Sequence, residues 1–479
     1  MMRTLFNSII AFTVLFLGSN FSFAQDYLIK NVNLIPMTSD QVMANHSVLI
    51  KGGKIAKICK QARQCLDGEA QRIDGSGKFL IPGLSDMHVH VDGLAPLKGS
   101  ATAEQVAMAK RVQSQQLRQY LMFGVTTLRD VAGGELNLET RDKINRGEMA
   151  GPRLYTSYVP MDGDPQLHSL TTPFSNPKTA ADFVRKTAAM GFDMVKIYST
   201  LNKETFDAIL DTGKEVGIPV MGHLPMQIDF EYAIKKGMRS IEHLSGYDVA
   251  CAGPDAGLLP TMDDVYQGWA YCTPQKIQQL AEITQKYPVW VDPTLTVVEE
   301  MVTEYERYSK QDVAAQYRNA QATLFSEYMF EIFHPRPRNG LKGSREVRLA
   351  LIKGLSDAGV PLLIGTDTTA SGFNVHQEMA LFAEAGLTPY QILKAATVEP
   401  ARYFDKEGEF GTIVEGASAE LVLLDKNPLA DIANAKAISG VMMRGQYWPK
   451  AKINAELAAI QEEYKVDLEM FKAMQAASH

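Results

Sequence analysis

The pattern of hydrophobic and polar positions changes character twice along the chain. In residues 26–79, short apolar runs alternate with turn residues, and the run 47–51, the glycine pair at 52–53 and the run 54–58 predict a β-hairpin. From residue 80, strand-like apolar runs alternate with stretches of helical spacing. After residue 404 short β-like runs return. The pattern therefore predicts an α/β region between two β regions.

The central region reads as eight strand-then-helix units. The strands are predicted at 80–90, 125–131, 154–161, 194–198, 219–223, 240–243, 289–295 and 361–367. The helices are predicted at 102–123, 139–149, 179–190, 203–216, 230–236, 274–287, 345–358, 375–385 and 389–396, with a further helical region to about 333. Short buried strands separated by helices imply a parallel sheet. Eight units favour a closed (β/α)8 TIM barrel over an open doubly wound sheet, which is the alternative.

These boundaries predict four regions. Residues 1–24 form a signal peptide, residues 81–404 form the barrel, and residues 451–479 form a C-terminal helix. The β segments 25–80 and 405–450 flank the barrel in sequence. We expect them to join in a small β-sandwich domain built from both chain ends.

The first residues have the three-part pattern of a secretory signal. Arg3 supplies positive charge, residues 5–18 are mostly apolar, and a small-x-small pattern ends at Ala24. The apolar run is shorter than the roughly 20 residues of a spanning helix. We therefore expect a secreted, periplasmic protein with no membrane association after cleavage. An uncleaved membrane anchor is the alternative.

Composition and cysteine content limit the partners, disulfides and metal ligands that we expect for this protein. The formal net charge is −7 with acidic and basic residues interspersed, which argues against a nucleic-acid partner. Export makes two local disulfides the expectation for Cys59, Cys65, Cys251 and Cys272, with four buried thiols as the alternative. No C-x-x-C pair occurs, so zinc ligation by cysteine is not expected. The sequence leaves open whether the protein forms a homo-oligomer.

Candidate metal ligands gather at predicted strand ends. His88 and His90 lie two apart on the first strand, so their rings point to the same face. His223, His243 and Asp367 end the fifth, sixth and eighth strands. A single histidine is more often a core or surface residue, but active sites in this fold lie where strands end. The five together predict a metal site, with zinc favoured and iron, manganese, cobalt or nickel as substitutes.

Four further residues are candidates. Lys196 lies within a predicted buried strand, so it pairs with a carboxylate, reaches the barrel mouth, or carries a carbamate formed with carbon dioxide. Tyr198 is two residues further and is a candidate for stabilising an oxyanion. Arg129, beside Asp130, would bind substrate, brace a metal ligand or form a structural ion pair. His168, in the loop after the third strand, is a candidate substrate contact.

The motifs around these residues resemble the amidohydrolase superfamily. They are the segments 82–90 (PGLSDMHVH), 195–196, 222–223, 242–244 and 365–367, with 388–397 and 411–416 in the tail. The chain is most similar to the branch with imidazolonepropionase-related proteins and carbamyl-lysine dipeptidases of the Xaa-Pro and Xaa-Arg type. The resemblance covers nearly the whole chain after residue 24.

The resemblance implies a set of roles. His88 and His90 would bind the more buried metal ion with Asp367, His223 and His243 would bind a second, and carbamylated Lys196 would bridge them. Imidazolonepropionase uses one metal and lacks the bridging lysine, so the expected cofactors are two divalent metal ions. They would make hydroxide available near neutral pH. Asp367 would then carry the proton of the attacking water to the leaving nitrogen.

The expected function is metal-dependent hydrolysis of a carbon–nitrogen amide bond, with a dipeptide, an N-acyl amino acid or another small molecule as substrate. One alternative is a mononuclear deaminase or cyclic amidase like imidazolonepropionase. Another is a non-catalytic secreted binding protein on the same barrel. A serine hydrolase is not expected, because no Gly-x-Ser-x-Gly motif occurs.

Overall fold

The computed structural model describes residues 25–65, 67–91, 102–167, 170–253, 267–303, 313–324, 343–368 and 370–477. The predicted signal peptide and most of the helical region predicted up to residue 333 lie outside these ranges. Among the described helices, none combines the length and the apolar character needed to cross a bilayer.

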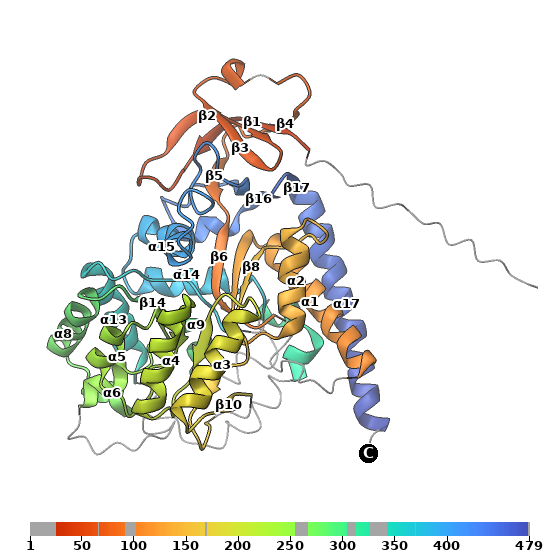
Figure 1. Cartoon of the computed structure of the whole chain (residues 1–479). Helices are drawn as coiled ribbons and strands as arrows, with labels where there is room; N and C mark the ends of the chain where they lie inside the picture. The colour runs from red at the N-terminus through yellow and green to blue at the C-terminus, as the bar shows by residue number, and fades with distance from the viewer. Residues whose placement is uncertain are drawn as a thin grey trace, which may run out of the picture.

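Strands from both ends of the chain share one eight-stranded sheet, at the top of Figure 1. Its order is β17-β16-β15-β5-β1-β2-β3, with β4 also paired to β1. Its strands are β1 (Tyr27–Leu34), β2 (Met43–Lys51), β3 (Lys54–Cys59), β4 (Gln71–Asp74), β5 (Phe79–Pro82), β15 (Glu420–Leu424), β16 (Ile438–Met443) and β17 (Gln446–Pro449). The ends meet where β15 runs antiparallel to β5, with Leu421 opposite Pro82. The predicted sandwich of two sheets is not shown, because these strands are hydrogen-bonded into one.

The strands of the α/β region are short and buried. A three-stranded sheet contains β6 (Leu84–Val89), β7 (Val125–Asp130) and β8 (Arg153–Thr156). A six-stranded sheet has the order β10-β9-β11-β12-β13-β14. Its members are β9 (Met161–Asp162), β10 (Thr172–Pro173), β11 (Val195–Ile197), β12 (Val220–Gly222), β13 (Ser240–Glu242) and β14 (Trp290–Asp292). All pairings within both sheets are parallel, as predicted.

The two parallel sheets do not join into one closed sheet among the described residues. Isolated parallel bridges connect them at Ser157 with Met194, and continue β14 at Val291 with Leu362. The Met87 N–H then donates to the Ile364 carbonyl at 2.8 Å, so residues 361–367 lie between β14 and β6. The predicted eighth strand is therefore irregular. It follows the barrel path but turns at Asp367, whose φ is 51°.

Helices cover the parallel strands in Figure 1. They are α1 (Ala103–Met122), α2 (Glu135–Asn145), α3 (Pro177–Ala189), α4 (Lys203–Val216), α5 (Phe230–Lys236), α6 (Tyr247–Ala252), α8 (Pro274–Gln285), α9 (Leu295–Thr303), α13 (Arg345–Asp357), α14 (Val375–Glu384), α15 (Pro389–Ala396), α16 (Val398–Tyr403) and α17 (Lys450–Ala477). Short 3-10 turns are η1 (Ala62–Cys65), η3 (Gly268–Tyr271), η4 (Val313–Tyr317) and η5 (Ile432–Lys436). Several helices begin at side chains that accept backbone N–H groups, including Thr102, Asn202 and Thr388.

The C-terminal helix α17 runs along α1 (Figure 1). Arg118 of α1 donates to Glu456 at 2.8 Å and to Glu463 at 2.6 Å. Asp467, which is buried, accepts from Arg111 and from Gln115. These bonds attach the last helix to the first helix of the α/β region.

Both expected disulfides form. Cys59 joins Cys65 between β3 and η1, and Cys251 joins Cys272 between α6 and η3. The structure contains no free cysteine. The alternative of four buried thiols is therefore wrong for this structure.

Candidate metal centre

The sheet-to-barrel connection sets the position of the first histidines. β6 begins two residues after β5 ends, so it continues away from the eight-stranded sheet, as Figure 1 shows. His88 lies within β6 and His90 directly follows it. The Asp367 N–H donates to the His88 carbonyl at 2.8 Å, which brings the irregular eighth segment alongside. The predicted ligands from the two ends of the barrel path therefore meet far from the sheet.

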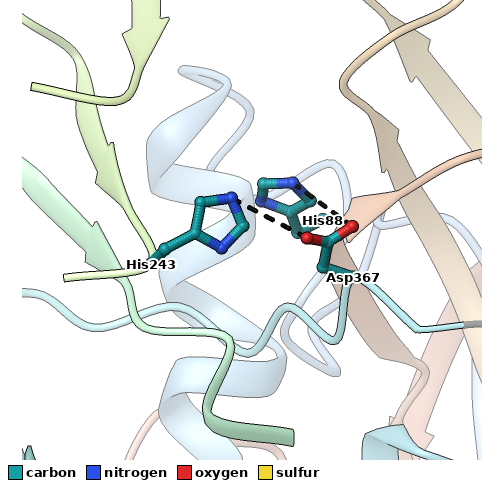
Figure 2. A group of neighbouring side chains, drawn as sticks. All are labelled: His88, His243 and Asp367. Carbon is teal, nitrogen blue, oxygen red and sulfur yellow. Dashed lines mark ion pairs between the residues drawn. The ribbon is translucent and has the colours of Figure 1, made fainter. Parts of the chain in front are cut away.

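Asp367 contacts three of the predicted histidines. Its Oδ1 lies 3.0 Å from Nε2 of His90 and 3.8 Å from Nε2 of His88. Its Oδ2 lies 3.8 Å from Nε2 of His243. The ligand atoms of His88, His243 and Asp367 all lie within 4.8 Å of one another, and Figure 2 shows the two rings facing the carboxylate. Imidazole nitrogens and a carboxylate oxygen at this spacing suit a divalent transition metal.

The other two predicted ligands border this group. The rings of His223 and His243 are 4.8 Å apart between centroids. Lys196 in β11 is buried, and its Nζ lies 3.4 Å from Nε2 of His88. All six predicted ligands are therefore brought together in one connected group.

Backbone geometry at the site is unusual. His243, Thr294 and Asp367 have φ angles of 60°, 44° and 51°, in the left-handed region that side chains other than glycine rarely adopt. Two of these residues are predicted ligands, and Thr294 contacts the ring of His243. Such conformations concentrate at functional sites because surrounding contacts must hold them.

Each of three histidines has a polar partner at Nδ1. Glu242 Oε2 lies 2.7 Å from Nδ1 of His88. Ser199 Oγ lies 2.8 Å from Nδ1 of His223, and Thr294 Oγ1 lies 2.6 Å from Nδ1 of His243. A partner at Nδ1 directs the opposite nitrogen, Nε2, toward a metal ion. The donor set therefore fits a metal centre.

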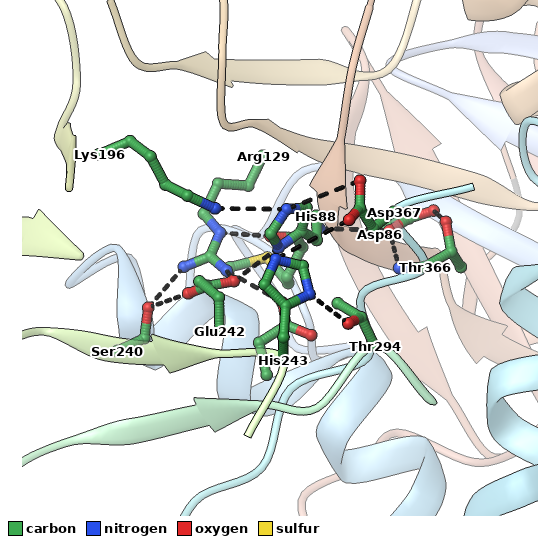
Figure 3. A network of polar contacts seen from close by, with 12 residues as sticks. Asp86, His88, Arg129, Lys196, Ser240, Glu242, His243, Thr294, Thr366 and Asp367 are labelled. Atoms are coloured by element: carbon green, nitrogen blue, oxygen red, sulfur yellow. Dashed lines mark hydrogen bonds and ion pairs between the residues drawn. The ribbon is translucent and has the colours of Figure 1, made fainter. Parts of the chain in front are cut away.

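Arg129 is fully buried beside Glu242, the carboxylate that contacts His88. It donates from Nη2 to Glu242 at 2.7 Å and to Asp292 at 2.9 Å, and from Nη1 to Ser240 at 2.9 Å. Its Nε donates to the Met87 carbonyl. Figure 3 shows Arg129 in this network with Glu242 and Ser240. Of the roles expected for Arg129, the geometry favours bracing a metal ligand over contact with substrate, because no part of the side chain is exposed.

Asp86 fixes the two segments that carry His88 and Asp367. Its Oδ1 accepts from the backbone N–H of Thr366 at 3.0 Å, and its Oδ2 accepts from the Thr366 hydroxyl at 2.7 Å (Figure 3). On the other side of the same segment, a Cβ at Gly365 would collide with the Asp292 carboxylate. Only glycine fits there.

Burial is the main influence on the protonation of the side chains at this site. It lowers the pKa of Lys196 to about 8 and that of His243 to about 3. Burial, with the nearby Lys196 charge, holds the pKa of His88 well below its usual value. Burial alone would raise the pKa of Asp367, but its hydrogen bond to His90 and its electrostatic interactions with the neighbouring His90, His243 and Lys196 side chains outweigh burial and lower it. The site thus favours neutral imidazoles at His88 and His243 and an ionised Asp367, which are the forms that bind metals.

Two predicted site residues remain, Tyr198 and His168. The ring of Tyr198 stacks on that of His223, with centroids 3.9 Å apart, so Tyr198 borders the ligand group. His168 lies outside the described residues. The loop before it is fixed by Asp162, which accepts from Thr200 N–H at 2.8 Å and from Leu167 N–H at 2.8 Å.

The sequence analysis missed the residues that hold the ligands: Asp86, Ser199, Glu242, Asp292 and Thr294. Two signals could have found some of them. Asp86 lies two residues before His88, and so on the same face of β6. Asp292 ends β14 and satisfies the same strand-end criterion as the predicted ligands. No signal distinguished the serine and threonine, because such residues are common in loops.

Comparisons with known proteins bear on this site. The profile of the amidohydrolase family matches residues 79–447. An adenine deaminase from Chelativorans sp. (strain BNC1) is 28% identical over 202 residues, which cover 42% of this chain and 32% of the deaminase. The chain therefore matches about a third of that relative. Ochratoxinase from Aspergillus niger is 21% identical over 417 residues, covering 77% of this chain and 75% of that protein.

A crystal structure of a Xaa-Pro dipeptidase with bound methionine superimposes with a TM-score of 0.66 at 22% identity. The alignment covers 89% of this chain and all of that one. This likeness supports a TIM-barrel-type α/β fold. The profile match spans most of the chain and includes every predicted ligand from His88 to Asp367. The chain accordingly belongs to the amidohydrolase family, as its motifs predicted.

Proposed function

We propose that this protein is a metal-dependent hydrolase that cleaves the carbon–nitrogen amide bond of a dipeptide or an N-acyl amino acid. The observation that carries the proposal is the convergence of four histidines, Lys196 and Asp367 on one group. Family membership and the resemblance to a Xaa-Pro dipeptidase support amide chemistry. The substrate class rests on that resemblance and on the expected export of the chain.

We propose that His88, His90 and Asp367 hold one divalent ion and His223 and His243 a second, with zinc favoured. When bound, the ions supply an activated water and polarise the carbonyl group under attack. Asp367 takes the proton of that water at its carboxylate and delivers it to the leaving nitrogen, so water and amide become acid and amine. Tyr198, whose ring stacks on that of His223, would donate to the developing oxyanion in this proposal.

Lys196 carries a carbamate in this proposal. The ammonium group first loses a proton, and the neutral Nζ then attacks carbon dioxide. An N–C bond forms, one carbon–oxygen π bond breaks and the nitrogen loses a second proton to solvent, so the loss of two protons and the gain of carbon dioxide turn a cation into an anionic ligand. Burial favours the reaction, because the lowered pKa of Lys196 increases the share of neutral amine. The anion also relieves the repulsion that a buried ammonium group would exert on a metal ion beside His88.

The test is a panel of dipeptides and N-acyl amino acids assayed with zinc, together with metal analysis after purification with and without bicarbonate. We expect turnover of some members, two metal ions per chain and loss of activity in Lys196→Ala. One metal ion per chain with full activity in Lys196→Ala would overturn the binuclear arrangement.

A second candidate is a deaminase or cyclic amidase, which the similarity to adenine deaminases favours. The same panel therefore includes adenine and cyclic amides. Turnover of those compounds, with none of any open-chain amide, would replace the first proposal with the second.

A further inference from the structure

The three histidines with Nδ1 partners differ in the chemistry of those partners. His88 meets the carboxylate of Glu242, whereas His243 meets the hydroxyl of Thr294. An ionised carboxylate can only accept hydrogen bonds, but a hydroxyl can donate or accept. The first kind of partner determines which ring nitrogen holds the proton, and the second kind does not.

The contacts of Glu242 with Arg129 and Ser240 require it to accept. Arg129 donates to Oε2 at 2.7 Å, and an arginine in a protein has only donors. The Ser240 hydroxyl accepts from Arg129 at 2.9 Å and therefore donates to Oε1 of Glu242 at 2.6 Å. With both oxygens facing donors, Glu242 can only accept at its contact with the ring, and His88 must place its proton on Nδ1.

The contacts at Nε2, on the opposite edge of the His88 ring, also indicate that the proton is on Nδ1. Lys196 Nζ lies 3.4 Å from Nε2 of His88, so this nitrogen faces a donor and needs its lone pair (Figure 3). Asp367 Oδ1 is 3.8 Å away, further than Glu242 is from Nδ1, and a neutral ring has only one proton to give. His88 is therefore oriented as a ligand through Nε2 without any metal.

His243 is held differently. Its Nε2 faces Oδ2 of Asp367 at 3.8 Å, and the Thr294 hydroxyl at Nδ1 can donate to the ring as readily as accept from it. A proton on Nε2 therefore satisfies both contacts in the metal-free protein. Binding a metal through Nε2 requires that proton to leave or to move to Nδ1.

We propose that Glu242 is a positioning residue that, held by Arg129 and Ser240, fixes His88 as an Nε2 ligand in advance, so that the His88 position binds its metal ion before and more tightly than the His243 position. The inference rests on the proposed metal-dependent function. It adds an order of loading and a residue that controls it.

One experiment reads the tautomers directly. Metal-free protein labelled with ¹⁵N-histidine is examined by long-range ¹H–¹⁵N correlation, with His88 and His243 assigned by substituting each with glutamine. We expect a single Nδ1-protonated form for His88 and an averaged or Nε2-protonated form for His243. A proton on Nε2 of His88, or averaging at His88, overturns the proposal.

A second experiment measures metal affinity by competition with a chromophoric chelator, using zinc alone. Glu242→Gln should weaken the tighter site by about 10- to 100-fold, and Thr294→Ala should weaken only the second site. The matched control is Glu399→Gln, a buried glutamate that pairs with Arg402 and touches no histidine. Equal weakening of both sites by Glu242→Gln, or no weakening, contradicts the inference.

The two proposals can fail separately. If no open-chain or cyclic amide is turned over but the tautomers and affinities behave as stated, the metal inference stands and the hydrolase proposal fails. If amides are cleaved but His88 exchanges tautomers, the hydrolase stands without this role for Glu242. Should Glu242→Gln not fold, the tautomer measurement on the unsubstituted protein still decides.

Discussion

The eight-stranded sheet and the metal centre bury their residues for opposite purposes. The core of the sheet consists of apolar side chains such as Ile29, Val48, Leu421 and Met442. The centre of the parallel strands buries Asp86, Arg129, Lys196, Glu242 and Asp292 at 3% exposure or less. Burying charge is unfavourable unless partners compensate it. The apolar core of the sheet therefore stabilises the fold. The buried charges of the metal centre reduce that stability and hold the ligands in place.

The largest expected effect that distinguishes the metal centre from the eight-stranded sheet comes from removing the charge of Asp367. Asp367→Asn keeps the size of the side chain but removes the group that carries the proton. We expect kcat to fall by roughly 10³-fold, within the range for general acid–base groups, with little loss of folding stability. Steady-state kinetics on a substrate from the panel, beside urea unfolding, measures both. Activity near that of the unsubstituted protein would remove Asp367 from the proton-transfer role.

Arg129→Met tests the compensation of buried charge. The substitution leaves Glu242 and Asp292 buried without their cation, so we expect a loss of about 3–5 kcal/mol in the free energy of unfolding. Combining it with Glu242→Gln should recover part of the loss, because one uncompensated charge disappears. Urea unfolding of the single and double variants gives the comparison. Stability unchanged in Arg129→Met would contradict the view that this network is a structural unit.

Leu421→Ala tests the sheet, where burial is apolar. Leu421 is 1% exposed, so the cavity should cost about 2–5 kcal/mol in unfolding free energy. Metal content and kcat of the folded fraction should stay the same, because the metal centre lies at the other end of β6. The matched control is Leu167→Ala, since Leu167 is 36% exposed and should change stability by about 0.5 kcal/mol or less. A changed metal content would show that the two regions are coupled.

The smallest effect is expected at an ion pair on the sheet. Hydrogen bonds from Lys78 and Lys450 hold the pKa of Asp425 at about 2. A lowered pKa stabilises the folded state above the ordinary value of 3.8, and that contribution disappears as pH falls through 2. Partial exposure reduces it to about 0.5 kcal/mol. Asp425→Asn should therefore be less stable than the unsubstituted protein at pH 6, and the difference should close toward pH 2. A constant difference across this range would assign the effect to something other than charge.

Much of the fold could be predicted because the spacing of apolar residues along the sequence indicates which face of each helix or strand is buried. The helices at 203–216, 230–236 and 389–396 agree with α4, α5 and α15, and the parallel strands lie within or close to their predicted runs. The eighth strand is irregular because Gly365 must pack against Asp292 and Asp367 must turn into the site. Those are contacts between segments far apart in sequence, and periodicity does not report them.

The residues of the metal centre also divide into those that the sequence could predict and those that it could not. His88, His90, His223, His243 and Asp367 could be predicted because their side chains belong to strand ends in a known architecture. The joint role of Glu242 and Asp292 could not, since a position at a strand end does not reveal that a buried arginine from β7 joins the two carboxylates. The role of Arg129 depends on depth in the barrel, which only three-dimensional packing determines.

The pairing of β5 with β15 has a consequence for how the chain is made. Phe79–Pro82 leaves the ribosome more than 300 residues before Glu420–Leu424, its neighbour in the sheet. Until synthesis reaches β15, the β5 edge has no partner, and an unpaired apolar edge readily joins another chain. The sheet is thus completed late, and contacts of such sequence separation form slowly. A ribosome-stalled chain ending before residue 420 should consequently need a chaperone to stay soluble, whereas the completed chain closes its own edge.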